Sequence, residues 1–211
     1  MAIRPQEAER FSPQRRATDQ LGMQQRSQCL PFPVVIASAL LISALLLLGP
    51  AAARSKADQC GGADRPAYSL SGKAAAKATL CLLNKERSSR GMKALRFDRD
   101  QQKAASKHNR VMLQQDCFSH LCPGEKDLVG RIVSTGYLPC TCTWGVAENL
   151  AWGEGPTSTP AAVVNAWMNS PDHRVNILNP RYDEIGIAVD DGSPEGGGPA
   201  ATYTTDFGFK D

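Results

Sequence analysis

An uncharged apolar run of fifteen residues, VVIASALLISALLLL at 34–48, divides this chain and decides which part of it can fold as a domain. The polar segment before it, residues 1–33, carries five arginines against three acidic residues. The small-residue stretch GPAAA follows at 49–53. A basic flank, an apolar segment and a small-residue site together are typical of a secretory signal peptide. The sequence therefore predicts that the chain after residue 53 is exported.

The segment 34–53 also has a second interpretation. A membrane-spanning helix needs about 20 apolar residues, and the run of fifteen is short for one unless residues 49–53 extend it. The long N-terminal flank is compatible with an uncleaved signal anchor, but we favour cleavage. In both cases the predicted localisation is outside the cytoplasm, either secreted or anchored. Contact with a membrane is then expected only through this N-terminal segment.

The exported part is nearly neutral. From Arg54 onward there are 19 Lys and Arg residues and 18 Asp and Glu residues. This balance leaves no basic stripe of the kind that binds nucleic acid, so we exclude a nucleic-acid partner. Residues 54–72 contain glycine and proline with few apolar side chains and are predicted to form a linker or a wrapped arm. The folded domain is predicted to span 73–211.

Six of the seven cysteines follow the apolar run, namely Cys60, Cys81, Cys117, Cys122, Cys140 and Cys142. Six cysteines in an exported domain indicate three disulfides, and 15 connectivities are open. We expect Cys60 to pair with Cys81, and the other four cysteines to staple loops around His120 and Trp144. A zinc site on these cysteines is a weaker interpretation, because thiols oxidise outside the cell and neither spacing is C-x2-C.

Hydrophobic periodicity in the domain predicts helices first and strands last. Helices are expected over 74–90, from Asp98 or Asp100 to Gln115, over 127–135, from a Thr159 cap, and again from Ser170. Strands are expected over 146–152, 185–189 and 201–207, the last two as an antiparallel hairpin around a glycine-rich loop. This order predicts an α+β fold in which helices flank a small antiparallel sheet.

Rare polar residues point to a site. His120 lies between two cysteines, Glu148 lies in a mostly apolar predicted strand, and His173 lies in the first turn of a predicted helix. Two imidazoles and one carboxylate can bind zinc or another divalent cation with water at an open position, so we predict a metal site at these three residues. Their long spacing does not by itself support the site. The alternative for Glu148 is a structural acid, either hydrogen-bonded to backbone amides or paired with Arg131 or Arg174.

The other candidates for chemistry have structural explanations. His108 lies on the apolar side of its helix and is predicted to be packed there with one hydrogen bond. Ser119 and Ser170 lie close to histidines in sequence, but neither is part of a G-x-S-x-G motif. Ser170 is therefore predicted to be a helix cap rather than a nucleophile.

Seven segments resemble one family in order: LCLLNKER at 80–87, AASKHNRVM at 104–112, FSH at 118–120, RIVSTGY at 131–137, AENLAWG at 147–153, AWMNSPDHRVNILNP at 166–180 and YDEIGIAV at 182–189. Residues 75–209 in this way resemble the bacterial branch of the CAP superfamily. This superfamily comprises cysteine-rich secretory, antigen 5 and pathogenesis-related 1 proteins, and its members are also called SCP-like extracellular proteins. The resemblance implies an α-β-α sandwich.

The resemblance also implies a cleft with two histidines and two glutamates. Three of the four positions fall on His120, Glu148 and His173, but the second glutamate falls on Ser170, and Ala147 replaces the usual glycine. The resemblance therefore does not imply chemistry that requires both acids.

Because members of the family differ in function, we expect a ligand-binding module with a divalent-cation cleft, and the ligand is a small molecule, a lipid or a cell-envelope component. Alternatives are a metal-assisted hydrolase with Glu148 as general base, and lipid or sterol binding without metal.

Overall fold

The computed structural model describes residues 60–138 and 143–211. The predicted signal or anchor segment, residues 54–59, Cys29, Cys140 and Cys142 lie outside the described residues. Within the part that is described, no helix is both long enough and apolar enough to cross a bilayer.

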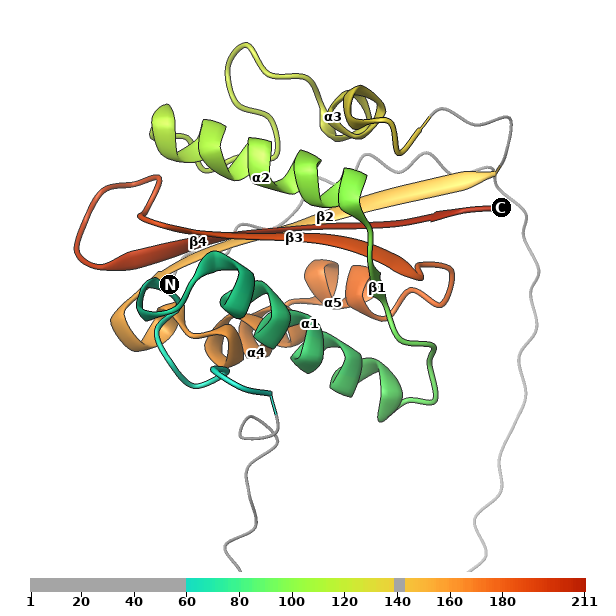
Figure 1. Ribbon diagram of the computed structural model, residues 1–211, viewed down its shortest axis with the longest axis horizontal. Helices are drawn as coiled ribbons and strands as arrows, with labels where there is room; N and C mark the ends of the chain where they lie inside the picture. Colours follow the sequence, from blue (N-terminus) through green and yellow to red (C-terminus); the bar gives the residue numbers. More distant parts are fainter. Residues whose placement is uncertain (1–59, 139–142) are drawn as a thin grey trace, which may run out of the picture. The chain divides into compact units, whose positions relative to one another are not determined.

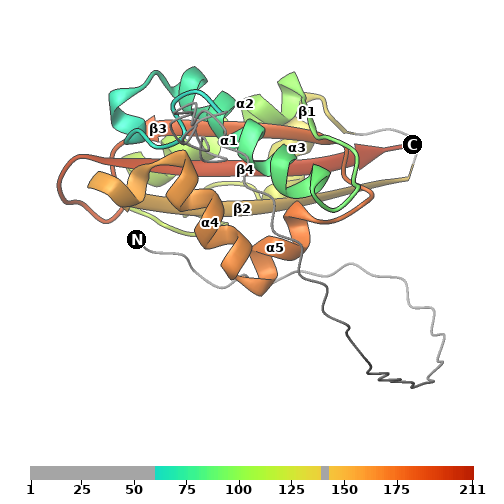
Figure 2. The same cartoon turned by 90° about the horizontal axis from the view of Figure 1, so that it is seen from below.

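The elements follow one another as η1 (Ala67–Ser69), α1 (Gly72–Ser88), β1 (Arg96–Phe97), α2 (Arg99–Gln114), α3 (Leu128–Thr135), β2 (Trp144–Glu154), η2 (Gly155–Ser158), α4 (Pro160–Asn169), α5 (Pro171–Ile177), β3 (Glu184–Asp191) and β4 (Ala200–Lys210). The sheet lies between α2 and α3 on one face and α1, α4 and α5 on the other (Figures 1 and 2). The predicted α-β-α sandwich is confirmed.

The sheet has the order β1-β3-β4-β2. The β3–β4 hairpin and the β2–β4 pair are antiparallel, as predicted. The two-residue strand β1, which the periodicity did not predict, runs parallel to β3, so the sheet is mixed rather than purely antiparallel. A pair of residues is too short to show an alternating pattern. Strand β2 is also longer than predicted, because it pairs with β4 along its whole length.

Side-chain caps begin four of the five α-helices in the described part of the chain. Asp98 accepts hydrogen bonds from two backbone amides at the start of α2, and Asp127 and Thr159 each accept one at the starts of α3 and α4. Each cap satisfies an amide that has no partner within the helix. The predicted starts at these three residues are confirmed. Ser71 caps α1 in the same way.

The largest apolar cluster lies between the sheet and the helices α1 and α4. The large side chains of Trp167, Tyr203 and Phe207 are fully buried in it. Residues 60–71 also pack there through Cys60, Ala63 and Ala67, and the predicted Cys60–Cys81 disulfide ties this segment to α1.

Two glycines of the sheet, Gly186 and Gly208, face helix α2 and let it pack close to the strands. A Cβ on Gly186 would collide with the backbone of Gln101, and one on Gly208 would collide with the side-chain amide nitrogen of Gln101. At Gly186 the obstacle is backbone, so no side chain fits there, whereas at Gly208 the side chains of Gln101 and Tyr137 would have to move. This close approach places His108, two turns along α2, against the polar residues of β2 and β4.

Candidate functional site

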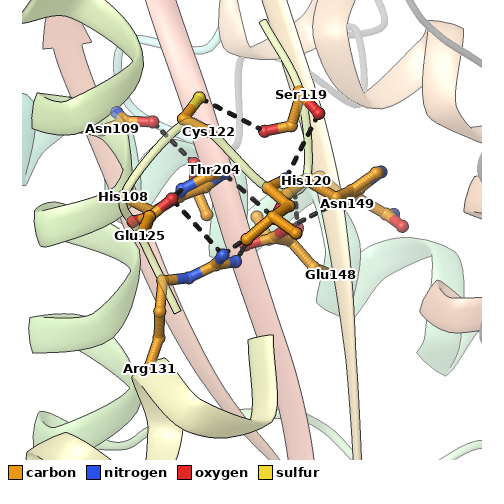
Figure 3. A network of polar contacts seen from close by, with 12 residues as sticks. His108, Asn109, Ser119, His120, Cys122, Glu125, Arg131, Glu148, Asn149 and Thr204 are labelled. Atoms are coloured by element: carbon orange, nitrogen blue, oxygen red, sulfur yellow. Dashed lines mark hydrogen bonds and ion pairs between the residues drawn. The ribbon is translucent and has the colours of Figure 1, made fainter. Parts of the chain in front are cut away.

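Glu148 is the centre of a buried polar network on the α2 and α3 face of the sheet (Figure 3). It projects from β2, and its side chain is 1% exposed. One carboxylate oxygen, Oε1, lies 2.7 Å from Nδ1 of His120, and the other accepts a hydrogen bond of 2.5 Å from Nη2 of Arg131. Of the two interpretations of Glu148, the structure therefore contains the ion pair with Arg131, together with a contact to His120.

Arg131 also holds the loop that carries His120. Its Nη1 atom donates to the backbone carbonyl of His120 at 2.8 Å and to that of Lys126 at 3.3 Å. The disulfide between Cys117 and Cys122 closes the same loop. The expected staple near His120 is therefore present. The loop and Glu148 are joined through one guanidinium group, which suits the planar, multi-donor geometry of arginine.

A second histidine and a second acid extend the network into the domain. His108 is fully buried on α2, and its Nδ1 lies 2.8 Å from Oε2 of Glu125. The prediction of a packed histidine with one hydrogen bond is confirmed. Its Nε2 atom lies 3.9 Å from Oε1 of Glu148, and Arg131 approaches Glu125 to 3.6 Å.

Asp206 faces Glu148 from the neighbouring strand. The two residues are direct cross-strand partners of β2 and β4, and both are buried. Burial and the adjacent negative charge of Glu148 raise the pKa of Asp206 well above its ordinary value of 3.8. Burial acts on Glu148 in the same sense, but the electrostatic effects of His108 and Arg131 and the hydrogen bond with His120 outweigh it and lower the pKa of Glu148 far below its ordinary value of 4.5. Two adjacent carboxyl groups thus have opposite protonation preferences.

His173 approaches from the other face of the sheet. It lies in the first turn of α5 and is fully buried, and its backbone carbonyl accepts a hydrogen bond of 3.1 Å from Nδ2 of Asn149. Its Nδ1 lies 2.7 Å from Oγ of Ser170, whereas Nε2 has no hydrogen-bond partner among the described residues. Burial, and then the charge of His120, lower the pKa of His173 to about 4, so the ring is neutral at physiological pH.

The three predicted site residues therefore lie at the edge of the sheet that β2 forms. His120 contacts Glu148 on one face of this strand, and His173 lies beside Asn149 on the other. His120 is 33% exposed at its side chain, whereas the other two are buried. No group of three His, Cys, Asp or Glu side chains within 60–138 and 143–211 is arranged to hold a metal ion as it stands.

The chemistry of the donors fits a cation at the two histidines better than at the carboxylate. Both oxygens of Glu148 already have partners, one in the His120 ring and the other in the buried guanidinium of Arg131. His173 offers a neutral imidazole nitrogen that has no partner among the described residues, and His120 uses Nδ1 for Glu148, which leaves its Nε2 for another partner.

Sequence reasoning missed Asp206 and Glu125 as members of this network. Asp206 is the only charged residue of the predicted strand 201–207, and an acid in such a strand was a detectable signal. Glu125 follows a cysteine-bounded turn and has no pattern that distinguishes it from a surface residue. Ser170 is at the predicted helix start, but its hydroxyl bonds His173 and accepts no hydrogen bond from a backbone amide of the described chain, so the cap interpretation of its side chain is wrong.

A mixed four-stranded sheet between two helical layers, with disulfides and a histidine and acid cluster at its edge, defines an SCP-type sandwich protein. The family model of CAP, the cysteine-rich secretory protein family, matches residues 80–205, more than half of the chain. The protein belongs to this family.

Two bacterial proteins are similar to this chain. The uncharacterized protein YkwD of Bacillus subtilis is 36% identical over 118 residues, which are 56% of this chain and 43% of YkwD. The uncharacterized membrane protein YlbC of the same organism is 30% identical over 116 residues, 54% of this chain and 31% of YlbC. This chain thus matches less than half the length of either relative.

Two solved structures share the fold. An outer surface protein of Borrelia burgdorferi superposes with a TM-score of 0.56 at 21% identity, covering 67% of this chain and 97% of that one. An extracellular protein of Bacillus anthracis that contains an SCP domain gives 0.50 at 24% identity, with coverage of 65% of this chain and 43% of that one.

Proposed function

We propose that this protein is an exported CAP-domain ligand-binding module whose His120 and His173 bind a divalent cation such as zinc. The observation that carries the proposal is the buried Nε2 atom of His173, which has no hydrogen-bond partner among the described residues. A buried polar atom of this kind is rare in native proteins and needs a specific explanation. The extracellular SCP-domain protein of Bacillus anthracis supports export, as does the predicted signal segment.

In this proposal Glu148 orients His120. A carboxylate on Nδ1 of a histidine fixes the tautomer and leaves Nε2 as the metal-binding atom. The contact of 2.7 Å between Glu148 and His120 is of this kind. Direct binding by Glu148, as in the three-ligand prediction, would bring the metal ion close to the positively charged guanidinium of Arg131, which disfavours it.

The alternative hydrolase, with Glu148 as general base, is less well supported. An efficient general base has a pKa close to the working pH. The pKa of Glu148 is lowered far below its ordinary value, because His108, Arg131 and His120 outweigh the opposing effect of burial. A carboxylate of this kind is a poor proton acceptor. A bound cation would supply a Lewis-acidic open position, and we propose that this position holds an anionic or polar group of a small molecule, a lipid or a cell-envelope component.

Zinc titration of the metal-free, oxidised full-length protein tests the proposal. We expect one zinc ion per chain by calorimetry for the wild type, and at least a hundredfold weaker binding for His120→Ala with His173→Ala. The double variant keeps His108, the third histidine of the chain, so zinc binding that persists in it does not depend on His120 or His173. Circular dichroism checks that the variant is folded. Equal, weak binding by both proteins would eliminate the cation site and leave lipid binding without metal as the next hypothesis to test.

A further inference from the structure

Helix α5 begins differently from the other four α-helices of the described chain. In α1 to α4 the residue at the N-cap accepts a hydrogen bond from a backbone amide through its side chain, as Thr159 does from Ala162 at 3.1 Å. Ser170 occupies the same position in α5 and has the extended backbone of an N-cap, with φ −101° and ψ 118°. Its hydroxyl makes no capping bond within the described residues and lies 2.7 Å from Nδ1 of His173 instead.

Hydrogen bonds hold both the backbone and the ring of His173. Nδ2 of Asn149 donates to the backbone carbonyl of His173, and Asn149 itself accepts from Asn176 one turn further along α5. Ser170 holds Nδ1, so only Nε2 is without a partner among the described residues.

The burial of the two side chains determines which atom donates. A neutral imidazole carries one N–H, on either Nδ1 or Nε2. His173 is fully buried, and a buried N–H without an acceptor is costly, so the proton is better placed on Nδ1, where Oγ of Ser170 accepts it. Ser170 is only partly buried, so its hydroxyl group can donate its own hydrogen bond to a solvent water molecule.

We propose that Ser170 is a positioning residue that accepts the Nδ1–H of His173 and thereby keeps the Nε2 lone pair free to bind a cation. This inference rests on the proposed function for its biological meaning, but the tautomer exists without any metal. It assigns the Ser170 hydroxyl to the site and not to the helix end. The opposite arrangement, in which Ser170 donates to Nδ1, would be the one expected of a serine nucleophile.

Nitrogen-15 NMR of histidine-labelled, metal-free, full-length protein at pH 8 measures the tautomer directly, because the protonated and unprotonated ring nitrogens have different chemical shifts. We expect His173 in the wild type to be the Nδ1–H tautomer. Ser170→Ala should produce a mixture of the two tautomers, and Ser170→Thr, which keeps the hydroxyl, should restore the wild-type spectrum. Zinc affinity should fall about 10- to 100-fold in Ser170→Ala and stay close to wild type in Ser170→Thr.

Thr159→Ala is the matched control, because Thr159 caps α4 and does not contact His173 in the described structure. We expect Thr159→Ala to lower the denaturant midpoint without changing the His173 spectrum, and Ser170→Ala to change the spectrum with a smaller effect on the midpoint. An Nε2–H tautomer in the wild type, or a Ser170→Ala variant with an unchanged spectrum and the midpoint loss of Thr159→Ala, would overturn the proposal. If the wild type shows the expected tautomer and binds no zinc, the positioning role stands and the cation-binding function fails.

Discussion

Glu148 and Asp206 are adjacent, buried carboxylic acids, but their surroundings change their pKa values in opposite directions. Glu148 has Arg131 and His120 as hydrogen-bonding partners, whereas burial and the charge of Glu148 keep Asp206 protonated to a higher pH. The pair therefore carries a single negative charge, on Glu148, in the interior beneath α2. Replacing each acid by its amide separates the two roles, because both changes preserve shape.

Glu148→Gln should destabilise the domain by about 3 kcal/mol, since removal of one partner leaves the buried Arg131 without its charge complement. Glu125, 3.6 Å from Arg131, limits the loss. Urea unfolding at pH 7 measures it. A loss below about 1 kcal/mol would show that the ion pair does not determine the stability of this region.

Asp206→Asn should leave stability at pH 7 unchanged or raise it. A carboxyl group whose pKa is raised in the folded state stabilises fully below its unfolded pKa, near 3.8, and this contribution is lost as the pH rises through the folded pKa. The amide does not titrate, so the stability of the variant relative to the wild type should increase between about pH 4 and pH 7. Unfolding curves at the two pH values test the sign. A variant that is less stable than the wild type at pH 7 would contradict it.

The lowered pKa of His173 predicts a different pH dependence. Its ordinary value is 6.5 and the folded value is about 4, so its contribution is fully present above pH 6.5 and is lost as the pH falls towards 4. His173→Gln should remove this part of the pH dependence and leave the loss at still lower pH that Glu148 causes. Parallel urea titrations of wild type and variant at pH 7, 5.5 and 4.5 measure the difference, and equal slopes would show that His173 does not titrate in this window.

At the scale of the elements, one arginine joins helix α1 to the segment between α5 and β3. Arg87 is fully buried, and its guanidinium donates to four backbone carbonyls, those of Lys93, Ile177, Asn179 and Tyr182. No acid pairs with it at salt-bridge distance within the described residues. It therefore satisfies carbonyls that lie at the end of α5 and in the following loop, where no regular partner is available.

Arg87→Met, which keeps most of the apolar stem, should cost about 3 kcal/mol or more, because four carbonyls lose a charged donor and three of them are 90 or more residues away in sequence. Arg87→Lys should rescue only part of this loss, since an ammonium group cannot reproduce the planar set of donors. Thermal unfolding compares the two variants. Full rescue by lysine would mean that the charge alone matters.

At the scale of the whole domain, the Cys60–Cys81 disulfide joins the segment before α1 to the core. The bridge closes a loop with a sequence separation of 21. A loop of this length restricts the unfolded chain by roughly 3 kcal/mol. We expect Cys60→Ser with Cys81→Ser to lower the free energy of unfolding by about this amount, and the same pair of changes at Cys117 and Cys122, with a separation of 5, to lower it less. Equal losses would contradict the loop-entropy explanation.

The amino-acid sequence alone determined the helix starts, the alternating strands and the family, because capping residues, hydrophobic periods and ordered motifs act over a few neighbours. The helix caps Asp98, Asp127 and Thr159 bond to amides only two or three residues away, so the sequence alone shows where these helices begin. Export, the cation site and the domain boundaries stay predictions.

Only the tertiary structure decided which polar groups meet. Glu148 pairs with Arg131, and Asp206 joins it, because antiparallel pairing of β2 with β4 places the two acids opposite each other. Ser170 looked like a cap, since its sequence position is that of one, but its hydroxyl bonds His173. Electrostatic and hydrogen-bond partners depend on distances across the fold, and spacing along the chain does not contain those distances.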